Sequence, residues 1–148
     1  METLKTVYTI GHSNRSLQEF LNLLKTCGID TVVDVRRFPG SRRVPWTLRE
    51  NLEKTLPENG IKYVWLPELG GLRKGGYRKH METEEYRRGL EKLLKIIDEG
   101  ENITLMCKEK LWLKCHRRFI ADSLVERSIK VVHIVEAGKL REHRAGQP

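Results

Sequence analysis

The sequence predicts a three-layer α/β/α domain built on a mainly parallel sheet of about five strands. Two observations carry this prediction. Five short apolar runs alternate with four segments whose apolar residues recur at helical spacing, the order that is typical of a parallel sheet covered by helices on both faces. The chain has 148 residues, which suits one domain, and no repeat or low-complexity segment divides it.

The five apolar runs are rich in β-branched and aromatic residues, and turn-forming residues bound them. They predict strands at residues 7–10, 29–36, 61–66, 103–107 and 130–135. We place the single folded domain within residues 1–148, with its core at about 6–136. Residues 137–148 carry no such pattern and are expected to form a loose C-terminal tail.

Four helices are expected between the strands, because apolar residues recur there every three or four positions. The first follows a cap at Ser13, Asn14 or Ser16 and covers about residues 17–27. The second opens with a capping box that begins at Thr47 and closes at residues 57–60. The third opens at Thr83 and the fourth covers residues 115–127.

Positive charge is the main functional signal in the composition. The chain carries 28 Lys and Arg against 20 Asp and Glu, a formal net charge of +8. This excess favours a nucleic acid or a phosphorylated small molecule as partner. No apolar run is long enough to span a bilayer and no signal-peptide pattern is present, so we expect a cytoplasmic protein without a membrane partner. Three cysteines are too few for a disulfide framework.

Residues suited to chemistry are concentrated after the carboxyl ends of the expected strands. Parallel strands bring these ends to one edge of the sheet, where α/β domains bind their ligands. The candidate anion-binding residues at this edge are Gly11, Ser13, Asp34, Arg36, Ser41, Arg42, Gly71, Arg73 and Arg117. The candidate catalytic residues are His12, Cys107, Glu109, Cys115 and His116.

The segment from Cys107 to Arg117 is the strongest local signal. Cys107 ends a strand, and Cys115 lies near the first turn of the next helix, where unpaired amides and the helix dipole stabilise a thiolate or a bound anion. His116 and Arg117 add positive charge, so we expect a lowered pKa for Cys115. Three alternatives stay open: the thiols are small core side chains, they bind zinc together with His116, or they form a transient disulfide. No cofactor is predicted.

Two other strand ends carry paired polar residues. Asp34 and Arg36 share one face of the second strand, so Arg36 would bind an anion with Asp34 as orienter or base, or the two would form a structural ion pair. Amides at the end of the first strand would cradle a phosphate, and His12 would act as an acid or base near neutral pH. The alternative makes Ser13 a helix cap. The glycine-rich residues 70–73 lack the spacing of a dinucleotide-binding loop and are interpreted as a flexible lid.

These motifs resemble domain-of-unknown-function family number 488. The resemblance covers residues 7–143 and rests on segments 9–13, 33–42, 69–73, 105–109, 115–121 and 133–134, with His143. It implies an α/β domain with its site at the residues singled out above after the first, second and fourth strands, and it implies no reaction. A looser similarity to rhodanese-like and cysteine-phosphatase domains implies a Rossmann-like or rhodanese-like sheet, although nine residues separate Cys107 from Arg117, more than in those enzymes.

Together these signals favour an enzyme, a hydrolase or transferase that acts on a phosphate-bearing nucleic acid or nucleotide. Arginines would bind the anion, Cys107 or Cys115 would be the nucleophile, and His12, His116 or Glu109 would transfer protons. One alternative is a non-catalytic nucleic-acid-binding module with structural thiols. Another is a redox sensor that uses the two cysteines. The sequence predicts no oligomeric state.

Overall fold

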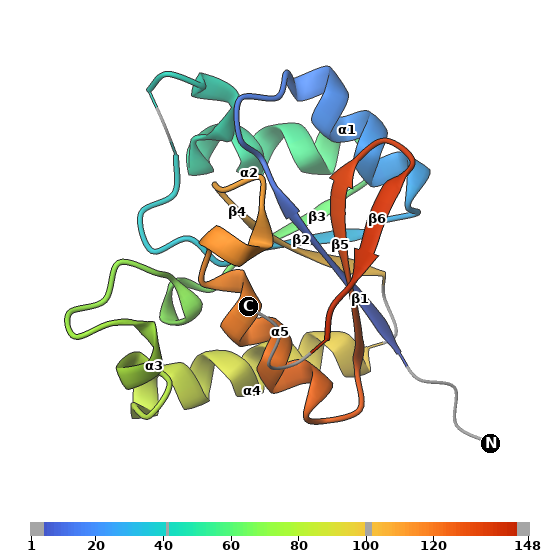
Figure 1. Ribbon diagram of the computed structural model, residues 1–148. Coiled ribbons are helices and arrows are strands. Elements are labelled where there is room, and N and C mark those ends of the chain that lie inside the picture. The colour runs from blue at the N-terminus through green and yellow to red at the C-terminus, as the bar shows by residue number, and fades with distance from the viewer. Residues whose placement is uncertain (1–4, 41, 100–101, 145–148) are drawn as a thin grey trace.

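The chain folds around one sheet of mostly parallel strands, as the computed structural model shows for residues 5–40, 42–99 and 102–144 (Figure 1). The strands in chain order are β1 (Thr6–Gly11), β2 (Thr31–Asp34), β3 (Lys62–Trp65), β4 (Ile103–Cys107), β5 (Lys130–Glu136) and β6 (Lys139–Glu142). Their order across the sheet is β3-β2-β4-β1-β5-β6. Strands β1 to β5 pair in parallel and β6 pairs antiparallel with β5. The predicted α/β class with a mainly parallel sheet is confirmed.

Five α-helices connect or flank these strands in the described ranges. They are α1 (Leu17–Thr26), α2 (Arg49–Glu58), α3 (Tyr77–His80), α4 (Glu84–Asp98) and α5 (Arg117–Val125). Three 3₁₀ turns, η1 (Pro45–Thr47), η2 (Pro67–Leu69) and η3 (Trp112–Lys114), lie in the loops. No helix among these residues is both long enough and apolar enough to cross a membrane.

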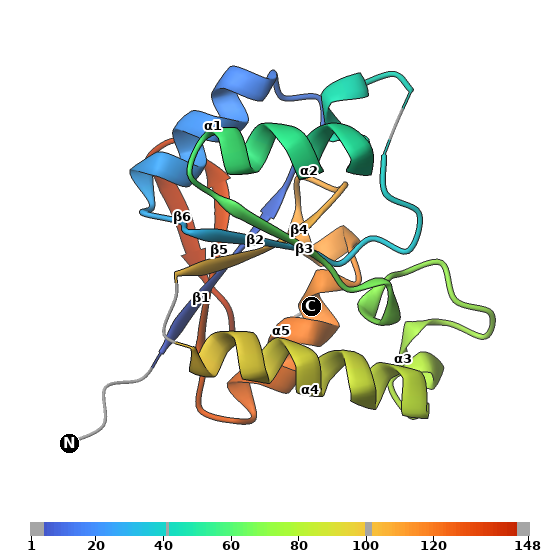
Figure 2. The same cartoon turned by 180° about the vertical axis from the view of Figure 1, so that it is seen from behind.

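The strand order explains why the helices lie on two faces of the sheet. The crossovers from β1 to β2 and from β2 to β3 run toward one edge of the sheet, and those from β3 to β4 and from β4 to β5 run toward the other. Because such crossovers are right-handed, a reversal of direction changes the face on which the helix packs. Helices α1 and α2 therefore cover one face while α4 and α5 cover the other (Figures 1 and 2).

The reversal of the crossover direction also predicts where a ligand would bind. The loop after β4 turns toward one face, and the loops after its neighbours β1 and β2 turn toward the other. A crevice opens at such a switch point, outside the carboxyl ends of the strands. The register places Gly11 beside Cys107 and Asp34 beside Met106, so the three strand ends lie next to one another at this crevice.

Two apolar layers hold the sheet between the helices. In β4, Leu105 and Cys107 pack in the layer under α4 and α5, whereas Met106 packs in the layer under α1 and α2. Cys107 is 1% exposed, so its sulfur is held by the surrounding core.

Two of the predicted helix caps are confirmed and one is wrong. Ser16 caps α1 in a reciprocal capping box with Glu19, and Thr83 caps α4, as two of the predicted signals indicated. The capping box predicted at Thr47 is wrong. Its hydroxyl donates instead to the carbonyl of Val44 within η1, and α2 begins after Leu48 without a side-chain cap.

Two elements were not expected. Helix α3 follows the glycine-rich segment that was interpreted as a lid. The expected loose tail instead contains β6, which returns along β5 through a turn where Gly138 has a φ of 73°. All four side chains of β6 are exposed, so the strand shows no apolar alternation, and backbone pairing with β5 alone defines it.

Candidate functional site

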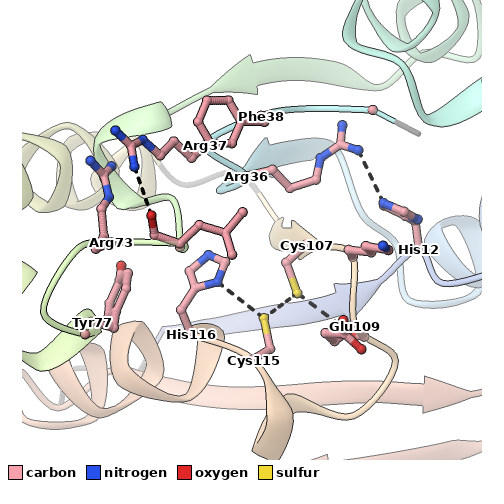
Figure 3. A pocket seen from close by; sticks show the side chains of 15 residues that line it. His12, Arg36, Arg37, Phe38, Arg73, Tyr77, Cys107, Glu109, Cys115 and His116 are labelled. Atoms are coloured by element: carbon pink, nitrogen blue, oxygen red, sulfur yellow. Dashed lines mark hydrogen bonds between the residues drawn. The ribbon is translucent and has the colours of Figure 1, made fainter. Parts of the chain in front are cut away.

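A cleft of about 590 Å³ opens at the carboxyl edge of the sheet (Figure 3). Segments after β1, β2, β3 and β4 all contribute to its walls, as the predicted clustering of strand ends requires. The lining side chains used below are His12, Arg36, Arg37, Phe38, Gly71, Leu72, Arg73, Tyr77, Cys107, Lys108, Glu109, Cys115 and His116. The volume lies within the range that is typical of small-molecule sites.

Two sulfur atoms lie in contact at the centre of the cleft. Cys107 ends β4 and Cys115 precedes α5, and their Sγ atoms are 2.7 Å apart with both thiols free. The amide of Arg117, in the first turn of α5, donates to the Cys115 sulfur at 3.4 Å. The Cys107 sulfur lies 3.8 Å from the Glu109 carbonyl. Each sulfur is therefore held by a strand end or a helix start and not by a flexible loop.

The two thiols have opposite preferences for the proton. The hydrogen bond from Cys107 lowers the pKa of Cys115 to about 4 against the effect of burial, and the charges of His116 and Arg117 add to the lowering. Burial raises the pKa of Cys107, and its contact with Cys115 raises it further. At neutral pH, Cys115 is a thiolate that accepts a hydrogen bond from the Cys107 thiol.

The Nδ1 atom of His116 faces the Cys115 thiolate and can exchange a proton with the sulfur. Its Nε2 lies 2.7 Å from the Val35 carbonyl, which only accepts, so Nε2 carries a hydrogen. Its Nδ1 is 3.5 Å from the Cys115 sulfur. A Cβ atom on Gly71 would come within 2.8 Å of that Nδ1. Gly71 thus leaves room for the imidazole.

Arg36 supplies a fixed positive charge to the opposite wall. Its guanidinium makes two hydrogen bonds with the fully buried Asp34 carboxylate, at 2.8 and 2.7 Å, and donates to the Thr47 carbonyl. The Asp34 carboxylate also accepts from Tyr63. The remaining nitrogen of Arg36 points to His12, at 3.3 Å (Figure 3). The ion pair that was one of the two predicted roles of Arg36 is observed, and Arg36 also lines the cleft.

His12 contacts Arg36, and its contacts argue against the expected role as an acid or base. Its Nδ1 donates to the Ser13 carbonyl, so the neutral ring presents Nε2 as an acceptor to Arg36. Burial lowers the pKa of His12 to about 4, and the charge of Arg36 acts in the same direction. At neutral pH the ring has no exchangeable proton on the side of the cleft.

The amides after β1 do not form the expected phosphate cradle. The His12 and Ser13 amides donate to the carbonyls of Cys107 and Lys108, so both are occupied. Ser13 does not cap α1, because Ser16 does. A Cβ on Gly11 would come within 1.7 Å of the Glu109 carbonyl oxygen, so the glycine allows close approach of the loop after β4. The backbone of residues 11–13 thus holds the loop after β4, which lines the cleft.

Arg117 also differs from its predicted role. The sequence placed it among the anion-binding residues, but its side chain is fully buried and takes no part in lining the cleft. It donates to the carbonyls of Glu109 and Lys110 and to the Thr9 hydroxyl. Its Nε has no partner among the described residues. The guanidinium therefore fixes the loop after Cys107 and acts on the sulfurs through its charge.

A chain of buried side chains continues from Arg117 to the far side of α5. The Thr9 hydroxyl contacts Nδ1 of His133, whose Nε2 is 2.9 Å from Nδ1 of His143. Nε2 of His143 contacts the Asp122 carboxylate at 2.7 Å. Because the carboxylate only accepts, Nε2 of His143 carries a hydrogen. This relay connects the residue after β6 to Arg117, whose guanidinium holds the loop after β4.

The other predicted residues are distributed around the cleft. Arg73 lines it, but its guanidinium donates to Glu85 and to the Gly70 and Pro67 carbonyls. Glu109 lines it with an exposed side chain, Arg42 is exposed and does not line it, and Ser41 lies outside the described residues. Across residues 5–40, 42–99 and 102–144, no group of three or more His, Cys, Asp or Glu is placed to hold a metal.

The sequence reasoning missed Phe38 and Leu72, which line the mouth of the cleft. A signal was available for both. Each is the only large apolar side chain in a short run made up mostly of Arg, Lys, Gly and Pro, at residues 36–43 and 70–76.

The chain matches the family model described as Domain of unknown function DUF488 over residues 16–124. Because this span covers more than half of the chain, the chain belongs to that family, and the resemblance noted from the motifs is confirmed. No curated protein and no solved structure matches it at a significant level. The family match includes Asp34, Arg36, Cys107 and Cys115, whereas His12 lies outside it.

Proposed function

We propose that this protein is an enzyme that uses the Cys115 thiolate as a nucleophile on a phosphate-bearing substrate, a nucleic acid or a nucleotide. One observation carries the proposal: a thiolate with a pKa of about 4 lies between a thiol donor and an imidazole, on the wall of a cleft that also holds the Arg36 guanidinium. Activated cysteines occupy such electropositive, partly enclosed sites.

Each residue has a role that its contacts support. Arg36, fixed by Asp34 and His12, contributes the positive charge that holds the substrate anion. The Cys115 sulfur attacks the electrophilic centre beside that anion, and a sulfur–substrate bond forms as the bond to the leaving group breaks. His116, as the imidazolium that received the cysteine proton, gives this proton to the leaving group. Water then cleaves the sulfur–substrate bond and restores the thiolate and the imidazolium.

Cys107 stabilises the resting thiolate and not the covalent intermediate. Its hydrogen bond to Cys115 keeps the nucleophile ionised before substrate binds. The helices on both faces of the sheet support the finer interpretation of the fold as a three-layer, Rossmann-like or rhodanese-like domain, in which a cysteine at a strand end lies at the ligand crevice.

The test combines thiol labelling with activity measurements. Iodoacetamide should alkylate Cys115 faster than Cys27, and phosphate-bearing ligands should slow the reaction at Cys115 only. Generic phosphate monoesters, diesters and nucleotides should then be turned over by the wild-type protein and not by Cys115→Ser, whereas Cys27→Ser should retain the rate. Equal alkylation of Cys27 and Cys115, with no protection by any anion, would refute the proposal.

The contact between the two sulfurs favours a second candidate, a peroxide-responsive thiol pair. The Cys115 thiolate would attack the O–O bond of a peroxide, giving a sulfenic acid and water (or an alcohol). The Cys107 thiol would then attack that sulfur, forming a disulfide and releasing water. Stoichiometric peroxide should yield one intramolecular disulfide, seen by mass spectrometry as the loss of two hydrogens. Overoxidation of Cys115 without a disulfide would exclude this role.

A further inference from the structure

Two large apolar side chains lie unburied at the mouth of the cleft. Phe38 is 66% exposed and Leu72 is 82% exposed, the highest values among the large apolar residues in the described ranges. They come from different loops, one after β2 and one after β3, and both line the cleft. Apolar surface at the opening of a cleft is typical of a site that contacts a ligand.

Arg37 holds the two loops in this arrangement. Its guanidinium donates to the Leu72 carbonyl at 2.9 Å and lies 5.1 Å from the centre of the Phe38 ring (Figure 3). Leu72 itself has a φ of 59°, a left-handed conformation that a leucine rarely adopts. The backbone is therefore held in a form that presents the side chain outward, against its own preference.

Exposed cations come from the segments that form the opening. Lys74 follows Leu72 in the same loop, Arg78 and Lys79 lie in α3, and Lys108 lines the cleft after β4. Within the part of the chain that the structure describes, no ion pair involves any of these four. The Arg36 guanidinium in the cleft is thus accompanied by two exposed apolar side chains on the lining loops and by exposed cations on the segment that follows Leu72.

We propose that the cleft takes an unpaired nucleotide within a single-stranded nucleic acid. Its phosphate would lie near Arg36, its base would contact Phe38 and Leu72, and flanking phosphates would meet Lys74, Arg78 and Lys79. The proposal rests on the phosphate-bearing substrate proposed above and narrows it. A mononucleotide has no flanking phosphates for the outer cations, and a base inside a duplex does not expose its face to an aromatic ring.

The experiment measures binding of fluorescent oligonucleotides by anisotropy at several salt concentrations, with duplex, mononucleotide and inorganic phosphate as competitors. The single strand should bind at least tenfold more tightly than the duplex or the mononucleotide. Phe38→Ala should weaken single-strand binding by about fivefold to 100-fold, the range for one stacked base. Leu140→Ala is the matched control, because Leu140 is 44% exposed on β6 and lines no part of the cleft.

The outer cations are tested by charge removal. Lys79→Ala should reduce the slope of log Kd against log salt by about 0.7 for one lost phosphate contact. Lys95→Ala is the control, because it removes the same charge from the last turn of α4, which precedes β4 at the edge of the sheet opposite the cleft. It should leave the slope of log Kd against log salt unchanged.

The outcomes separate this inference from the proposed function. Equal binding of duplex and single strand, or no effect of Phe38→Ala, overturns the inference. If mononucleotides still protect Cys115 from alkylation in that case, the proposed function stands. If no anion binds or protects, both are wrong.

Discussion

Replacing Cys107 with alanine tests the origin of the Cys115 thiolate. The variant removes the thiol that donates to the Cys115 sulfur, 2.7 Å away. A hydrogen bond to a charged group is worth about 1.5–3 kcal/mol, and one pKa unit corresponds to about 1.4 kcal/mol. We therefore expect the pKa of Cys115 to rise from about 4 by about one to two units. His116 and Arg117 still lower it in the variant.

The assay is the rate of iodoacetamide alkylation as a function of pH, measured by mass spectrometry in a Cys27→Ser background. Cys107→Ser keeps a hydroxyl donor at the same place and should keep the pKa closer to that of the wild type. This pair separates a lost hydrogen bond from a disturbed core, because both variants change the buried residue by a similar amount. The reasoning fails if the serine and alanine variants titrate together, or if neither differs from the wild type.

Three further predictions concern the supports of the cleft. Gly11→Ala should lower the free energy of unfolding by about 1–3 kcal/mol in urea denaturation, since its Cβ would overlap the Glu109 carbonyl; unchanged stability would contradict this. Asp34→Asn should lower the free energy of unfolding by about 3–5 kcal/mol, because it leaves the buried Arg36 charge without its carboxylate; a loss below about 1 kcal/mol would count against the ion pair. Burial lowers the pKa of His133 to about 2, so the unfolded chain binds the extra proton and Tm should fall as the pH drops from 6.5 toward 4. This fall should be shallower in His133→Gln.

The sheet and its functional edge could be predicted because they depend on short-range patterns. An alternation of apolar runs and helical segments is typical of a parallel sheet. Parallel strands bring their carboxyl ends to the same edge of that sheet. Ser16 and Thr83 were recognisable because a helix cap is defined by a few neighbouring residues. Thr47 has the same local signal, yet it lies in the 3₁₀ turn that begins at Pro45, and its hydroxyl donates to the Val44 carbonyl instead of capping α2. Strand β6 has no apolar signal to detect.

The roles of individual site residues could not be predicted in the same way. Asp34, Arg36, Cys107, Cys115 and His116 do gather at the predicted edge, because the strands and helix that carry them fix their positions. Whether a charged residue faces a ligand or holds the backbone depends on partners that are distant in the sequence.

Arg117 and His12 illustrate this limit. Both have the residue type expected of a binding or catalytic group, but their hydrogen bonds reach the Lys110 carbonyl, Thr9 and Arg36, and these bonds use the donors and acceptors that a substrate would need.

The relay from Thr9 to Asp122 has a consequence for the end of the chain. Both ring nitrogens of His133 and of His143 have partners, so neither ring can turn over without breaking two contacts. A displacement of the segment after β6 would withdraw His143 from this series and leave Nε2 of His133 without its partner, close to the buried guanidinium of Arg117. The segment after β6 thus supports the loop that carries the sulfurs, although more than thirty positions separate His143 from Cys107 along the sequence.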